Sequence, residues 1–81
     1  EIYPGRFIVL GDRGDTVLLL QQQLNRIAAQ DPDIPTVAED GIFGRGTQAA
    51  VLALQRKLGI DPTGAVGPVL WAQIIARGAG Y

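Results

Sequence analysis

The sequence predicts an all-α domain, a compact three-helix bundle with an internal repeat and a short extended N-terminal arm. Three apolar segments each follow a Gly-x-x-Gly step, and these steps are Gly11/Gly14, Gly41/Gly44 and Gly64/Gly67. Apolar residues in the segments recur at spacings of three and four, the period of a helix that buries one face. Two segments share four residues 34 positions apart: Val17, Leu20, Gln21 and Leu24 recur as Val51, Leu54, Gln55 and Leu58. Such a repeat indicates one supersecondary unit packed against its copy.

An arm or linker is expected over residues 1–9, laid over the core and anchored by Tyr3 and Phe7. The folded domain is expected over residues 10–78, and a C-terminal tail over 79–81. The first helix is predicted from Arg13 to about Ala29, with Asp12 as N-cap because its carboxylate can accept from free amides of the first turn. Its inner stripe is Val17, Leu20, Leu24 and Ile27. The residues expected largely off this stripe are Gln21, Gln22, Gln23 and Arg26.

The first helix is expected to end at residues 31–35, because Pro32 and Pro35 cannot continue a helical hydrogen-bond ladder, and a loop is expected from there to Asp40. Four acids lie in or beside it: Asp31, Asp33, Glu39 and Asp40. Several oxygens could hold calcium. Their spacing does not match the helix–loop–helix calcium loop, so turn chemistry and helix capping are favoured and no metal site is predicted.

The second helix is predicted from about Arg45 to Leu58, closed by Gly59 in the left-handed conformation. Its inner stripe is Thr47, Ala50, Val51, Leu54 and Leu58. The third helix is predicted from Pro68, where the missing amide costs nothing, to about Arg77. Trp71, Ile74 and Ile75 cover one of its faces. Gly78 and Gly80 are expected to unwind the tail.

Composition excludes several classes of function. The chain has 81 residues, a formal net charge of −1 and no basic stripe, so nucleic acid is not an expected partner. It contains no Cys, His or Ser, which removes the usual zinc ligands and the common nucleophile–base pairs, and no cofactor is expected. No apolar run approaches the roughly 20 residues that span a bilayer. Because the chain begins at Glu1 without Met or a signal peptide, we expect a mature product or an excised module.

Three strings of residues, in order, resemble the peptidoglycan-binding type 1 domain, a three-helix module common in bacterial cell-wall hydrolases. The first runs over residues 10–17 with Leu20, Gln21 and Leu24. The second, Asp40-Gly41-Ile42-Phe43-Gly44 followed by Thr47, Ala50, Val51, Leu54 and Gln55, is the most specific. The third runs over residues 59–68 with Trp71 and Ile74. Thr63 and Leu70 depart from the family pattern, which often has Asp and Thr there.

The resemblance implies non-catalytic, non-covalent binding to peptidoglycan by a targeting module beside a cell-wall hydrolase domain in the same chain. The companion would typically be an amidase, peptidase, muramidase or transpeptidase. It also implies an extracellular location, at the bacterial cell wall or in the periplasm, and a monomer is expected. The two carboxylates that a glycosidase would need lie here in turns and caps, without an apolar cleft to raise the pKa of one, so catalysis is not expected.

The residues expected to contact the ligand are Asp40, Ile42, Phe43, Arg45, Gln48 and Trp71. Phe43 and Trp71 either provide flat surfaces for a sugar ring or a stem peptide, or pack in the core. Asp40 is either a contact or a turn cap, whereas Arg45 and Gln48 either bind stem carboxylates and amides or form a solvated helix face. Gln21 and Gln55 either bond the backbone at the corners, which we favour slightly, or line the groove. That groove is expected between residues 40–48 and 63–71.

Two other interpretations remain open. The chain could be a protein-interaction or autoinhibitory module that docks on its own catalytic domain, or a structural module that needs calcium. Failure to bind isolated cell wall would favour the first, and a calcium-dependent shift of the melting temperature would favour the second.

Overall fold

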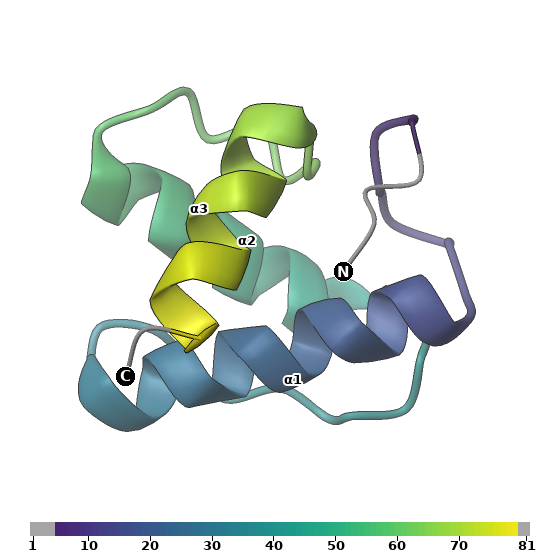
Figure 1. Ribbon diagram of the computed structural model, residues 1–81, viewed down its shortest axis with the longest axis horizontal. Coiled ribbons are helices and arrows are strands. Elements are labelled where there is room, and N and C mark those ends of the chain that lie inside the picture. The colour runs from purple at the N-terminus through teal and green to yellow at the C-terminus, as the bar shows by residue number, and fades with distance from the viewer. Residues whose placement is uncertain (1–4, 80–81) are drawn as a thin grey trace.

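The helices of the protein are α1 (Asp15–Gln30), α2 (Arg45–Leu58) and α3 (Pro68–Ala79), in a computed structural model that describes residues 5–79. In Figure 1, α3 crosses in front of α2, and the C-terminal end of α3 lies against α1. The principal extents are 26 × 24 × 23 Å, so the helices form one rounded bundle. The prediction of an all-α, three-helix bundle is confirmed. Tyr3, one expected anchor of the arm, lies outside the described residues.

One apolar core joins the helices, and the connections contribute to it as well. Its fully buried side chains from α1, α2 and α3 include the predicted stripe residues Leu20, Leu24, Val51, Leu54 and Ile74. The connections add Ile8, Ile34, Phe43 and Val66. The helical spacing therefore identified the buried faces, because residues three and four apart lie on one side of a helix.

The start of α1 differs from the prediction. Gly14 is the N-cap, and no side chain bonds the free amides there. The Asp12 carboxylate instead accepts from the backbone amide of Val9 at 2.9 Å and from Arg6 at 2.9 Å. The prediction of Asp12 as N-cap is wrong because this side chain turns back toward the segment that precedes it. The ends of α2 and the start of α3 agree better: Gly59 takes φ 75°, and Pro68 is the first helical residue.

The helical periodicity predicted the wrong environment for two glutamines of α1. Gln21 and Gln23 are buried, although both were expected off the inner stripe, whereas Gln22 and Arg26 are exposed as expected. Gln23 lies against α3 at Gly78, where an added Cβ would meet the Gln23 amide. Gly78 does not unwind the tail, since α3 continues through it to Ala79. Its missing side chain is what lets α3 come so close to α1.

The segment before α1 is tied to both glycine corners by backbone hydrogen bonds. Ile8 and Val66 exchange two N–H···O bonds of 2.9 Å each. Further along, the Gly11 amide donates to the Phe43 carbonyl at 2.9 Å, and the Phe43 amide donates to the Asp12 carbonyl at 2.8 Å. Ile8 is the buried anchor of this segment, whereas Phe7 rests on the backbone at Gly67 and stays 59% exposed.

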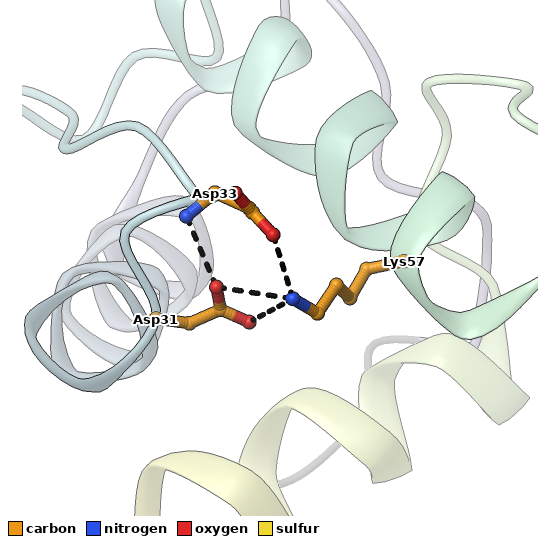
Figure 2. A network of polar contacts seen from close by, with 3 residues as sticks. All are labelled: Asp31, Asp33 and Lys57. Atoms are coloured by element: carbon orange, nitrogen blue, oxygen red, sulfur yellow. Dashed lines mark hydrogen bonds and ion pairs between the residues drawn. The ribbon is translucent and has the colours of Figure 1, made fainter.

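The acids of the first connection serve turns and an ion pair. Lys57, in the last turn of α2, contacts Asp33 at 2.7 Å and Asp31 at 3.3 Å, and the Asp31 carboxylate also accepts from the Asp33 amide (Figure 2). The pKa of Asp31 is lowered by the Asp33 amide and then by Lys57, and the pKa of Lys57 is raised by Asp33 and Asp31. These contacts join the end of α1 to the end of α2, which fits the favoured turn chemistry.

Candidate functional site

Gln21 holds the corner that leads into α2. Its side-chain oxygen accepts from the Gly41 amide at 2.8 Å, and its amide nitrogen donates to the Ile42 carbonyl at 2.9 Å. The same nitrogen also contacts the Asp40 carboxylate at 3.0 Å and the Thr47 hydroxyl at 3.1 Å. Gly41 has φ 73°, a left-handed conformation that glycine adopts without steric strain. A buried amide therefore fixes the backbone where α2 begins.

Gln55 holds the corner before α3 in the same manner. Its oxygen accepts from the Gly64 amide at 2.9 Å, and its nitrogen donates to the Ala65 carbonyl at 3.2 Å and the Thr63 hydroxyl at 3.1 Å. Gly64 has φ 78°. Thr63 supplies the side-chain oxygen that Asp40 supplies at the other corner. The two glutamines thus bond backbone at the corners, as the favoured interpretation predicted.

The structure separates the expected ligand-contacting residues into buried and exposed ones. Phe43 has no exposed surface and Trp71 only 5%, so both rings pack in the core. Ile42 and Arg45 are exposed at the start of α2. Asp40 is exposed too, but its carboxylate accepts from the Ile42 amide at 3.0 Å, and this bond, followed by that from Gln21, lowers its pKa. Asp40 therefore acts as a turn cap in the structure.

The expected groove between residues 40–48 and 63–71 is not an open channel. Gln48 lies against the corner before α3, so that a Cβ added at Gly64 would be only 3.1 Å from Gln48 Cγ. The segment before α1 also bonds both corners, at Val66 and at Phe43. The prediction of a groove between these corners is wrong because Gln48 and the segment before α1 lie there.

The surface formed by residues 5–79 carries a polar hollow and a mainly apolar one. One, of about 460 Å³, is polar and lies on the outer face of α1 beside the first connection; it is lined by Gln22, Asn25, Arg26, Ala29 and Glu39. The other, of about 430 Å³, is mainly apolar and lies around the start of α3. Its rim carries three exposed apolar side chains, Phe7, Ile60 and Val69, of which Val69 is 73% exposed. Sequence reasoning missed the polar hollow, because it combines α1 with Glu39 of the connection that follows. The apolar hollow is lined mainly by residues 60–70, which overlap one side of the expected groove.

Within residues 5–79, no cluster of three or more Asp or Glu side chains is placed to hold a metal ion. The three described helices include none with the length and apolar character that a membrane span requires.

A family model described as "Putative peptidoglycan binding domain" matches residues 13–74, which include both glutamine-held corners and most of the three helices. The chain belongs to this family. Members of this family bind peptidoglycan, the polymer of the bacterial cell wall, in a non-catalytic manner.

The peptidoglycan-binding domain is similar to one curated protein of Kitasatospora aureofaciens, described as an uncharacterized protein in the bpoA1 3′ region. The two are 44% identical over 64 residues, which cover 78% of the domain and 50% of that protein. The chain therefore spans about half the length of this relative.

Two crystal structures share its fold. The N-terminal domain of SleB gives a TM-score of 0.76 at 26% identity, covering 95% of this chain and 99% of the other. An L,D-transpeptidase from Xylanimonas cellulosilytica gives a TM-score of 0.74 at 34% identity; all of this chain aligns, but only 36% of the transpeptidase. The second structure thus carries the fold beside a larger remainder of chain.

Proposed function

We propose that the domain binds peptidoglycan without chemistry and thereby holds an attached cell-wall enzyme on its substrate. The observation that carries this proposal is the family match over residues 13–74. The L,D-transpeptidase supports the second part, since there the same fold occupies about a third of a chain named for catalysis. A domain that acts in this way is expected outside the cell, at the wall or in the periplasm, and as a monomer.

Tethering would act through concentration. A second binding event in the same chain becomes intramolecular, and its effective concentration reaches the millimolar range with a short flexible linker. The enzyme would then remain near the wall between turnovers even if the binding of one stem or one disaccharide were weak. No reacting group is needed in the domain itself, which fits its lack of Cys, His and Ser.

For the contact surface, we propose the exposed side chains at the start of α2, Ile42 and Arg45. No hydrogen bond or ion pair joins Arg45 to the other described residues, so its guanidinium is available to a carboxylate of the stem peptide. Asp40 and Gln48 would support this surface by fixing the corner and its neighbour. Phe43 and Trp71 would support it from the core, behind the exposed residues.

The test is sedimentation of the 81-residue chain with purified cell-wall sacculi stripped of protein. We expect the chain in the pellet, displaced by excess soluble muropeptide. If it stays in the supernatant while binding its companion catalytic domain in solution, the alternative of a protein-interaction or autoinhibitory module replaces the proposal. A fused reporter enzyme provides the control for targeting, since its wall-bound activity should fall when the domain is deleted.

A further inference from the structure

The polar hollow on α1 is formed by side chains that one helix face brings together. Gln22, Arg26 and Ala29 lie four and three residues apart, so they line one side of the helix, and Asn25 lies beside them. Glu39 reaches the same hollow from the connection between α1 and α2. Ala29 contributes only a methyl group, which leaves the space between the longer side chains open.

Asn25 fixes the connection against α1. Its side-chain oxygen accepts from the Val37 amide at 2.8 Å, and its nitrogen donates to the Val37 carbonyl at 2.9 Å. The same nitrogen donates to Glu39 Oε2 at 2.8 Å. The carboxylate of Glu39 is therefore positioned before any ligand arrives, which reduces the ordering that binding would require.

Two opposite charges share this hollow without pairing with each other. Among the described residues, no ion pair or hydrogen bond involves the Arg26 guanidinium, and no bond involves Glu39 Oε1. Lys57, by contrast, forms ion pairs with both Asp31 and Asp33. A free guanidinium and a held carboxylate on one rim match a ligand that carries a carboxylate and an ammonium group together.

We propose that this hollow binds a zwitterionic amino-acid unit, with its carboxylate on Arg26, its ammonium group on Glu39 and its amide groups near Gln22. The identity of the unit rests on the proposed function: it is the diamino dicarboxylic acid of an uncrosslinked stem peptide, whose side chain bears a free amine and a free carboxylate. The domain would thereby prefer stems that have not been crosslinked, since crosslinking consumes the amine.

Calorimetric titration with a soluble muropeptide that carries such a stem tests the proposal. Arg26→Gln and Glu39→Gln should each weaken binding roughly fivefold, the size expected of one exposed ion pair. Ala29→Leu should weaken it more than tenfold by filling the hollow. The matched controls Arg56→Gln and Ala72→Leu change exposed residues on α2 and α3 and should leave affinity unchanged. Melting curves confirm that each variant is folded.

The ligand provides the second arm. Acetylating the free amine of the stem should weaken binding to the wild type about fivefold and have no further effect on Glu39→Gln. Equal affinity for free and acetylated stems, or equal affinity for glycan strands without stems, would overturn the proposal. So would loss of affinity in Arg45→Gln with none in Arg26→Gln. The free diamino acid alone should bind more weakly than the muropeptide, and equal binding would assign the hollow to small amino acids instead.

Failure here and failure of the proposed function give different results. If the wild type sediments with sacculi and Arg26→Gln and Glu39→Gln sediment equally well, the cell-wall function stands and the α1 hollow is not its site. If the wild type binds the stem peptide in solution but does not sediment with sacculi, the hollow stands and wall targeting fails.

Discussion

Gln21 and Gln55 lie 34 positions apart on successive helices, and each holds the glycine corner that leads into the next helix. The Gly41 amide donates to Gln21 at 2.8 Å, and the Gly64 amide donates to Gln55 at 2.9 Å. Each glutamine then returns a bond to the carbonyl one residue further on. The starts of α2 and α3 are thus each fixed by a buried glutamine of the preceding helix.

Removing the first of these amides should be severe. Gln21→Ala deletes four hydrogen bonds and leaves the Gly41 amide without its partner, so we expect a loss of about 3 kcal/mol in the free energy of unfolding. Gln22→Ala, on the exposed face of α1, should change it by less than about 0.5 kcal/mol. Urea denaturation followed by circular dichroism measures both. Similar losses in the two variants would contradict a structural role for Gln21.

Alanine substitutions at Gly41 and Gly59, both of which have positive φ, should separate the cost of backbone strain from that of a steric clash. Gly59→Ala introduces only conformational strain, about 1 kcal/mol, because nothing lies within 4 Å of the added Cβ. Gly41→Ala adds a contact of 3.3 Å with the backbone oxygen of Gly14, which is itself held by the chain pairing there. We expect it to be the more destabilising of the two by thermal denaturation. The reverse order would show that the corner relaxes easily.

At the close approach of α3 to α1, the effect of Gly78→Ala on stability should depend on Gln23. Alanine is normally better than glycine inside a helix by about 1 kcal/mol. Gly78→Ala should nevertheless destabilise the protein, because its Cβ would lie 3.0 Å from Gln23 Cδ and nearer still to Gln23 Oε1.

The double variant Gln23→Ala/Gly78→Ala tests this account. The Gln23 oxygen has no hydrogen-bond partner, so its removal costs little in hydrogen bonding, and the collision disappears with it. We expect the double variant to be more stable than Gln23→Ala alone, with the helix preference for alanine restored. A purely additive cycle would contradict the contact.

Stability should fall in acid. The backbone amides of Val9, Asp33 and Ile42 lower the pKa of Asp12, Asp31 and Asp40, respectively, with further lowering by Arg6, Lys57 and Gln21. A carboxylate whose pKa is lower in the folded state stabilises the fold above the unfolded pKa of about 3.9, and this contribution is lost as pH falls through the folded pKa.

Melting temperatures should therefore be flat from about pH 5 to 7 and decline below about pH 4. Asp40→Asn should lower the melting temperature at neutral pH and make the decline in acid shallower, because one titrating group is gone. If the melting temperature of this variant declined in acid as steeply as that of the wild type, the hydrogen bonds of the Asp40 carboxylate would not stabilise the folded state.

The helical stripes and the glycine that closes α2 could be predicted because local spacing and backbone freedom decide them. Asp12 could not, since Arg6 and the Val9 amide compete for its carboxylate. Burial of Gln23 depends on how closely α3 approaches at Gly78, which periodicity along one helix does not contain. The polar hollow depends on Asn25, whose bonds to Val37 bring a connection twelve residues away beside α1.

The two connections differ in length: residues 31–44 join α1 to α2, whereas residues 59–67 join α2 to α3. Each connection nevertheless ends in a corner of the same kind, bonded by a glutamine of the preceding helix. Because the glutamine bonds only the last few residues of the connection, additional residues before them need not move the helix that follows. We therefore expect insertions at Pro35 and Thr36, both exposed, to leave the bundle unaltered, because the entropy cost of closing a loop rises only slowly with its length.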